Sequence, residues 1–320
     1  MTRPISVVAL GGGHGLHASL SALRRVVERL TAVVTVADDG GSSGRLRQEF
    51  GVLPPGDLRM ALAALCGDDE WGQTWAQVLQ HRFAGDGDMR GHVTGNLLIV
   101  SLWEQLGDHV QALDWVGRLL GASGRVLPMA LTPLVMTAQI RGVDPGAPDA
   151  VTTVRGQVEV ATSNGVIQSV ALEPGDPSPC AEAVAAVREA DWVVLGPGSW
   201  FTSVIPHLLV PELRQALVET GGRVIVVLNL APQDGETPGF DQADHLSALL
   251  EHAPALQVHT VLADIRSVPD RAVLEDVVKA AGARLVVADI AADDGSARHD
   301  PAKLAAAYDA LIEAGDSPRG

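Results

Sequence analysis

Short apolar runs alternate with glycine-rich or polar segments at the start of the chain. Residues 5–10 are apolar and stop at the glycines of 11–15, and the apolar positions of 16–30 then recur at helical spacing. A second apolar run, 32–37, ends at the acidic and glycine-rich segment 38–44. This order predicts a strand, a loop, a helix and a second strand, which together form a right-handed βαβ unit of a parallel sheet.

The same pattern returns in the second half of the chain. Four further strands are predicted at residues 192–195, 224–228, 258–262 and 285–288, each followed by a helical segment. Apolar strands that alternate with helices are typical of an open parallel sheet with helices on both faces.

Helices occupy much of the region between these halves. They are predicted over residues 58–65, 71–81, 95–106 and 112–120. Asp57 is a candidate N-cap for the first of them, because a short acidic side chain can accept hydrogen bonds from the free N–H groups of the first turn.

A different pattern follows from residue 125 to residue 172. Residues 157–160 alternate like a strand, and 163–165 carry a turn signal, which together indicate a small β-rich insertion. We therefore expect one three-layer, doubly wound, mainly parallel α/β domain over residues 1–314, with the insertion at about 125–172 and a disordered tail at 315–320.

Composition and charge narrow the class of ligand. Hydrophobic residues make up 47% of the chain and charged residues 19%, which suits a large core. Aromatic residues make up only 3% and the formal net charge is −16, so the chain is suited neither to stacking on bases nor to binding a phosphate backbone. Nucleic acid is therefore not expected as a partner, whereas a small phosphorylated ligand is compatible with local donors.

The cysteines and the hydropathy indicate the compartment. Cys66 and Cys180 are far apart in the sequence and are expected to be reduced thiols. No run of about 18 apolar residues occurs, and the first residues lack the layout of a signal peptide. We expect a cytoplasmic protein without stable membrane insertion.

Polar or glycine-rich segments follow four of the predicted strands. They are residues 11–15, 38–44, 196–199 and 229–233. In an open parallel sheet, ligands bind outside the carboxyl ends of the strands at the topological switch point, so these segments should converge on one cleft. The first loop also supplies backbone N–H groups at a helix N-terminus, which bind phosphate. The expected ligand is a nucleotide-type molecule.

Several charged side chains in these segments have alternative interpretations. Asp38 and Asp39 can accept a ribose hydroxyl, can hold Mg²⁺ through waters, or can lie in a solvated turn. Asp57 can cap its helix or can contact a ligand or a metal. His92 is either a general base or a structural histidine. Arg45, beside a Gly-Gly-Ser-Ser turn, can form charge-assisted bonds to phosphate.

The sequence contains no obvious arrangement for covalent catalysis. It has no H-E-x-x-H motif, and Ser199 lies outside a G-x-S-x-G elbow, so its hydroxyl suits a bond to phosphate better than nucleophilic attack. Leu16 stands where the dinucleotide fingerprint needs its third glycine, which argues against an NAD-dependent dehydrogenase. These features leave catalysis open and favour ligand binding.

Six motifs carry a resemblance to a known family. They are residues 11–16, 36–47, 54–59, 91–98, 196–203 and 298–300. Together they resemble the YvcK family of gluconeogenesis factors, relatives of the CofD phospholactate transferases, over residues 7–303. His14 departs from the family pattern, because many members carry Thr there and an imidazole replaces one hydroxyl contact.

The resemblance implies a three-layer α/β protein that binds a nucleotide sugar such as UDP-N-acetylglucosamine. The implied role is regulatory, in cell-wall morphogenesis and in growth on gluconeogenic carbon sources, with cell-wall-synthesis proteins as partners. The alternative is a Mg²⁺-dependent, CofD-like transferase of a phosphorylated group. A homo-oligomer that uses Trp200 and Phe201 as a contact surface is a further hypothesis, and burial of those two rings is its alternative.

The glycine loops and the resemblance together define the expected ligand-binding residues. These are Gly12, Gly13, His14, Gly15, Leu16, Asp38, Asp39, Gly40, Gly41, Ser42, Ser43, Arg45, Arg59, Gly95, Asn96, Gly196, Pro197, Gly198, Ser199, Thr202, Ser203, Asn229 and Arg298. The candidate Mg²⁺ ligands are Asp38, Asp39 and Asp57, and no catalytic residue is assigned.

Overall fold

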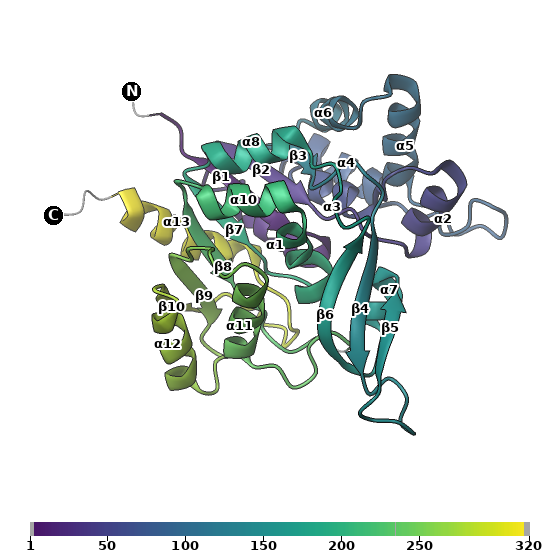
Figure 1. Ribbon diagram of the computed structural model, residues 1–320. Coiled ribbons are helices and arrows are strands. Elements are labelled where there is room, and N and C mark those ends of the chain that lie inside the picture. The colour runs from purple at the N-terminus through teal and green to yellow at the C-terminus, as the bar shows by residue number, and fades with distance from the viewer. Residues whose placement is uncertain (1–2, 234, 317–320) are drawn as a thin grey trace.

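The computed structural model describes residues 3–233 and 235–316 and has a seven-stranded parallel sheet at its centre (Figure 1). The sheet order is β10-β9-β8-β7-β1-β2-β3. The strands are β1 Ser6–Gly11, β2 Arg29–Val34, β3 Arg125–Pro128, β7 Trp192–Leu195, β8 Arg223–Val227, β9 Thr260–Asp264 and β10 Arg284–Ala288. All neighbouring pairs run parallel, which confirms the predicted doubly wound α/β fold.

Helices cover both faces of this sheet. The helices α1 Gly13–Leu23, α3 Gly56–Ala64 and α13 Pro301–Asp316 pack together on one face, and α8 Ala181–Glu189, α10 Pro211–Glu219 and α11 Gln242–His252 lie on the other (Figure 1). Because both faces are covered, every residue of β1 and of β7 is buried. This burial explains why the central strands appear in the sequence as continuous apolar runs.

The remaining helices complete the layers or extend beyond them. They are α2 Gly41–Phe50, α4 Glu70–Gln80, α5 Thr94–Leu106, α6 His109–Leu120, α7 Gln157–Ala161, α9 Pro206–Leu209 and α12 Arg271–Ala280, with a π-helical turn, η1, at Trp200–Val204. The helices predicted between residues 58 and 120 are therefore confirmed, each within three residues of its predicted ends.

The β-rich insertion is a second, antiparallel sheet of order β5-β4-β6. Its strands are β4 Val135–Arg141, β5 Val151–Arg155 and β6 Val166–Glu173. The insertion begins later than predicted, because β3 pairs with β2 and so belongs to the main sheet. The predicted strand at 157–160 was wrong: Gly156 ends β5 with a φ of 110°, and the carboxylate of Asp39 then accepts hydrogen bonds from the first two N–H groups of α7.

Two predicted boundaries near the N-terminus were also wrong. The helix after β1 ends at Leu23, and Leu30 lies in β2, because a short turn brings a second apolar segment into the helical spacing. Asp57 is not an N-cap: α3 begins at Gly56, with Pro55 at the cap position.

Trp200 and Phe201 are 0% and 4% exposed and pack in the core, which confirms burial, the alternative to a contact surface. The predicted tail needs correction. Helix α13 extends through Asp316, two residues into the predicted tail, and the rest of that tail lies outside the described residues.

Candidate functional site

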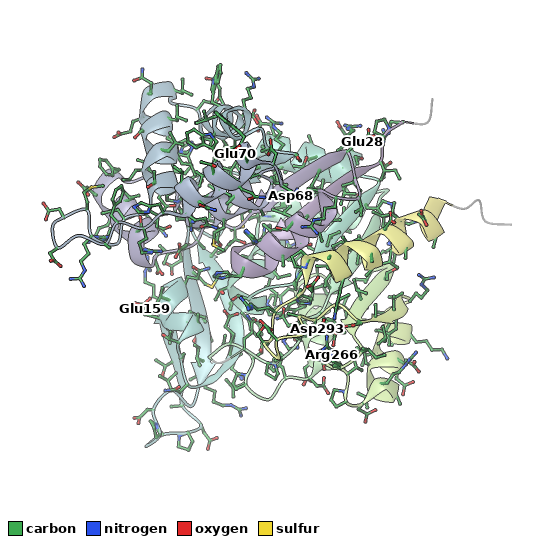
Figure 2. The ribbon with its side chains drawn as sticks, turned by 180° about the vertical axis from the view of Figure 1, so that it is seen from behind. Glu28, Asp68, Glu70, Glu159, Arg266 and Asp293 are labelled. Carbon is green, nitrogen blue, oxygen red and sulfur yellow. The ribbon has the colours of Figure 1, made fainter. Side chains whose placement is uncertain are left out.

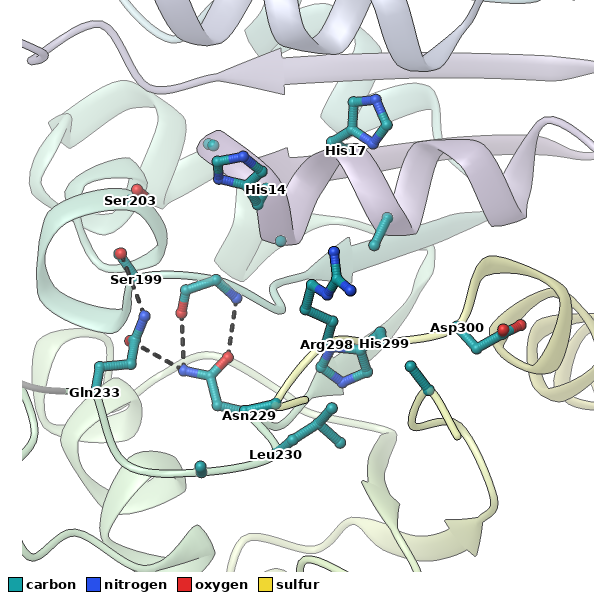
Figure 3. Close-up of a pocket in the computed structure, with 18 of the residues that line it drawn as sticks. His14, His17, Ser199, Ser203, Asn229, Leu230, Gln233, Arg298, His299 and Asp300 are labelled. Carbon is teal, nitrogen blue, oxygen red and sulfur yellow. Dashed lines mark hydrogen bonds between the residues drawn. The ribbon is translucent and has the colours of Figure 1, made fainter. Parts of the chain in front are cut away.

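A pocket lies where the order of the strands reverses. The chain after β1 leads into α1, whereas the chain after the neighbouring strand β7 leads into η1 and α10 on the opposite face (Figure 1). The diverging segments leave a pocket of ≈ 670 Å³ at the carboxyl ends of these strands, drawn in Figure 3. This is the position at which open α/β sheets bind ligands.

The pocket brings together nine of the residues predicted from the sequence. They are Gly12, Gly13, His14, Gly15, Gly198, Ser199, Ser203, Asn229 and Arg298. They come from four separate segments of the chain, which follow β1, β7, β8 and β10 in turn. The predicted convergence therefore holds for the segments after β1, β7 and β8, whereas segment 38–44 does not line the pocket and the loop after β10 takes the fourth place.

The glycine loops after β1 and β7 lie directly against each other. A Cβ atom added to Gly15 would lie 2.3 Å from the carbonyl oxygen of Pro197 and 2.4 Å from the Cα of Gly198. Gly13 has a φ of 58° and Gly198 a φ of 140°, both in the region that favours glycine. These glycines allow two backbone segments to form one wall of the pocket.

Asn229 fixes the second glycine loop in position. Its Oδ1 accepts a hydrogen bond from Gly198 N at 3.0 Å, and its Nδ2 donates to Gly198 O at 2.8 Å. The same Nδ2 donates to Gln233 Oε1, and Gln233 Nε2 donates to Ser199 Oγ (Figure 3). Asn229 therefore lines the pocket mainly as a support for its wall.

Arg298 is the exposed cation of the opposite wall. Its side chain is 74% exposed and extends toward α1 (Figure 3). Its Nη2 donates to Asp294 Oδ2 at 2.7 Å, and its Nε donates to Ser296 Oγ at 3.0 Å. The buried carboxylate of Asp264 holds the start of this loop by accepting from the N–H groups of Ile290 and Ala291.

Three histidines also line the pocket. His14 and His17 lie one turn apart on α1, and His299 follows Arg298. Burial lowers the pKa of His17, and it lowers the pKa of His299 to about 4, so the His299 ring is neutral at pH 7. Sequence reasoning missed His17, although its spacing of three from His14 on a helix was a usable signal. His299 lies in the motif 298–300 but was given no role.

An acidic pair lies behind the first glycine loop. An added Cβ on Gly12 would lie 2.5 Å from Asp57 Oδ2, and Asp57 accepts a hydrogen bond from the N–H of Gly13. Burial, reinforced by the nearby charge of Asp38, raises the pKa of Asp57 to about 7. Burial also raises the pKa of Asp38. One of these two carboxyl groups can therefore hold a proton near neutral pH.

Several predicted residues form a separate buried network that does not include the acidic pair. Ser42 Oγ accepts from Asn96 Nδ2 at 3.1 Å and from Val93 N at 3.2 Å, and Arg59 Nε donates to Asn96 Oδ1 at 3.0 Å. Arg59 also donates to Gln80. Since these polar groups satisfy one another, they tie α2, α3 and α5 together and do not line the pocket.

The other predicted residues also lie outside the pocket wall. Asp39 caps α7, Arg45 donates to the carbonyl of Arg90, and Thr202 donates to the buried carboxylate of Glu236. The rest that do not line it are Leu16, Gly40, Gly41, Ser43, Gly95, Gly196 and Pro197. Leu16 belongs to the core, at 1% exposed.

A metal site formed by protein side chains alone does not fit the described residues. Within 3–233 and 235–316, no group of three or more His, Cys, Asp or Glu side chains is arranged to hold a metal ion. Asp39 uses both of its carboxylate oxygens on α7, which leaves Asp38 and Asp57 as a pair.

The fold and the pocket define a doubly wound α/β protein with its candidate site at the switch point. The family described as "2-phospho-L-lactate transferase CofD" matches residues 7–300. The chain therefore belongs to the CofD family and, within it, to the group of gluconeogenesis factors, with which it shares most of its length.

Individual relatives support this membership. A "Putative gluconeogenesis factor" of Mycobacterium leprae is 51% identical over 96% of this chain and 86% of its own length. The "Gluconeogenesis factor" of Listeria innocua is 35% identical over 97% and 96% of the two chains. A crystal structure of a UPF0052 family member from Bacillus halodurans, 32% identical, has a TM-score of 0.84 and covers 96% of this chain and 99% of its own.

The helices of the described part of the chain are too short or too polar to cross a membrane.

Proposed function

We propose that this protein binds a nucleotide sugar of the UDP-N-acetylglucosamine type and acts as a regulator. The observation that carries the proposal is the meeting of two glycine loops and Arg298 in one pocket at the switch point. Glycine backbone at a helix N-terminus offers N–H donors and a favourable dipole for phosphate, and an arginine adds charge-assisted bonds. A diphosphate can contact the glycine loops on one wall and Arg298 on the other at the same time.

The size and the sign of charge of the site support the same ligand class. The volume of ≈ 670 Å³ falls within the range of about 300–1,000 Å³ that is usual for small-molecule pockets. The whole chain carries −16, so a diphosphate is bound only where local donors outweigh the general repulsion. Arg298 and the first turn of α1 provide such donors.

The names of the relatives suggest gluconeogenesis as the biological setting, and the cell-wall role is an addition of this proposal. We propose that the bound state of this protein regulates carbon flow into the cell wall and supports growth on gluconeogenic carbon sources. Interaction with cell-wall-synthesis proteins is part of this proposal. The proposal predicts that a deletion strain recovers growth on a gluconeogenic carbon source with the wild-type gene and not with the gene for Arg298→Ala.

Thermal unfolding with candidate ligands tests the proposal directly. UDP-N-acetylglucosamine at about 100 times its dissociation constant adds about 2.7 kcal/mol to the free energy of unfolding. The midpoint then rises by several degrees, and it rises more than with UDP, NAD or Mg²⁺ alone. The same midpoint with every UDP compound as without ligand rules out this ligand.

A second candidate function is a CofD-like transfer of a phosphorylated group. Asp57 favours it by position, because this buried carboxyl group, with its pKa raised to about 7 by burial, lies directly behind the Gly12–Gly13 backbone that lines the pocket. The two candidates separate after prolonged incubation with UDP-sugar and Mg²⁺. Chemically unchanged UDP-sugar supports the regulator, and a new phosphorylated product supports the transferase.

A further inference from the structure

A cluster of apolar side chains, three of them exposed, lies across α4 and α6, outside the pocket. Trp71 and Trp115 are 54% and 50% exposed, and Leu119 is 41% exposed. Trp75 stands one turn after Trp71 on α4 and is partly buried, because it also packs against the core. We call Trp71, Trp75, Trp115 and Leu119 the tryptophan face. It contains three of the six tryptophans in the chain. Clustered apolar side chains at a protein surface often mark an interaction site.

The side chains of the tryptophan face are held in place before any partner arrives. Trp71 Nε1 donates a hydrogen bond to Leu119 O at 3.3 Å, which joins the two helices. The Trp71 and Trp75 rings have centroids 5.6 Å apart, and the guanidinium of Arg118 lies 5.0 Å from the centroid of the Trp115 ring. Rings that are already ordered lose little conformational entropy on binding, and tryptophan is enriched among the residues that dominate interface energies.

The charges beside the tryptophan face indicate what kind of surface it accepts. Three successive acidic residues, 68–70, lead into α4, and Asp69 also caps this helix by accepting from Gly72 N. Figure 2 labels Asp68 and Glu70 there, and Arg24 forms an ion pair with Asp68. Arg118, over the Trp115 ring, is a cation within the same surface. A second copy of this chain would bring the same acidic segment and the same net charge of −16 to the contact. A positively charged partner is instead attracted.

We propose that the tryptophan face binds an amphipathic, basic helical segment of a partner protein. The apolar stripe of that segment packs on the four side chains, and its Lys or Arg side chains lie over residues 68–70. A helix on an apolar surface is a common mode of recognition, with anchors that repeat at helical spacing. This inference does not rest on the proposed ligand, because no residue of the tryptophan face lines the pocket.

The test uses the full-length protein and synthetic peptides, with isothermal titration calorimetry as the measurement. The probe is a Leu/Lys amphipathic helix of about 18 residues, which spans roughly 27 Å. One control peptide has Glu in place of Lys, and the other has the same Leu and Lys residues in scrambled order. We expect the amphipathic Leu/Lys peptide to bind at least ten-fold more tightly than either control.

Variants then locate the binding surface. The double variant Trp71→Ser with Trp115→Ser is expected to weaken the Leu/Lys peptide at least ten-fold. Val273→Ser on α12, where the side chain is 45% exposed, is the matched control and is expected to leave binding unchanged. Glu70→Lys keeps every apolar contact and is expected to weaken binding several-fold, so the test does not depend on the fold of the double variant.

Three results would overturn the proposal. Equal binding of the scrambled peptide would show attraction by charge alone, and equal binding by the double variant and by Glu70→Lys would place the peptide elsewhere. Analytical ultracentrifugation without peptide gives the third result. If the wild type self-associates and the double variant does not, a second copy of the chain is the occupant.

Discussion

At the scale of single residues, Arg298 and Asp294 have opposite effects on the binding of an anionic ligand. The Arg298 guanidinium forms its ion pair with Asp294 in the structure, and a bound phosphate would compete for it. The Asp294 carboxylate stays ionised, because hydrogen bonds from Ser296 and Arg298 hold its pKa at about 2. Asp294 therefore acts as an internal competitor of any anionic ligand.

Two substitutions separate these roles. Arg298→Ala is expected to weaken UDP-sugar binding at least ten-fold, because a charge-assisted bond is lost. Asp294→Asn is expected to strengthen it by about two- to five-fold, the range that an exposed ion pair supplies. Calorimetric titration measures both. Arg271→Ala and Glu275→Gln, from an i,i+4 pair on α12, are the matched controls, and equal effects there would contradict the assignment.

Asp57 predicts how stability depends on pH. Its folded-state pKa of about 7 lies above the ordinary value of 3.8, so between these two values the folded state binds more protons than the unfolded state. Stability therefore falls as pH rises from about 4 to about 7 and is constant above that range as far as Asp57 is concerned. Each unit of pKa difference corresponds to about 1.4 kcal/mol.

Asp57→Asn removes this dependence, because an amide cannot ionise and can still accept from Gly13. The variant is expected to unfold at a higher temperature than the wild type at pH 7.5, and the two should converge near pH 4. Thermal scans across pH measure the difference. Asp86→Asn, at a fully exposed side chain, serves as the control. A wild type that gains stability from pH 4 to pH 7 relative to Asp57→Asn would refute the raised pKa.

At the scale of elements, the contact between the two glycine loops determines the shape of the pocket. Gly15→Ala places a Cβ atom within van der Waals radii of the backbone of Pro197 and Gly198, neither of which can rotate away. We expect a loss of about 1–3 kcal/mol of unfolding free energy, as for overpacking, together with a loss of ligand binding.

Gly85→Ala is the matched control, because an added Cβ there meets no atom within 4 Å. Urea unfolding compares the two variants. The same stability for Gly15→Ala and the wild type would mean that the loops are not in close contact in solution.

The strands and helices show what periodicity predicts and where it fails. It located β1 and β7 because each is buried on both faces and therefore apolar throughout. It failed at α7, because the carboxylate that caps this helix belongs to Asp39, more than a hundred residues earlier. It also extended α1 as far as Leu30, since spacing alone does not reveal a tight turn between two apolar segments.

The candidate site was predictable for its backbone and less so for its side chains. The loops that follow β1 and β7 were located because glycine at the end of a strand is a local signal. Ser42, Arg59 and Asn96 were expected at the ligand, but they bond to one another. Which polar groups face a cavity depends on tertiary packing, and the local sequence does not contain that information.

At the scale of the whole molecule, the net charge of −16 opposes compaction. Exposed ion pairs such as Arg3–Asp191 recover little of this energy, because solvent screens them. We expect the unfolding midpoint to rise between about 0.02 M and 0.5 M NaCl, as the Debye length shrinks and the repulsion weakens. Differential scanning calorimetry at constant pH measures this. A falling midpoint would mean that the ion pairs outweigh the general repulsion.

The order of the strands also affects how the protein emerges from the ribosome. Strand β1 can pair with β2 soon after both are synthesised. Its other neighbour, β7, is complete only when synthesis reaches Leu195. At a translation rate of 5–20 residues per second, the β7-facing edge of β1 stays unpaired for about ten to forty seconds. During this interval the nascent chain exposes an unpaired apolar edge and half of the pocket, so we expect chaperones to bind it before any ligand can.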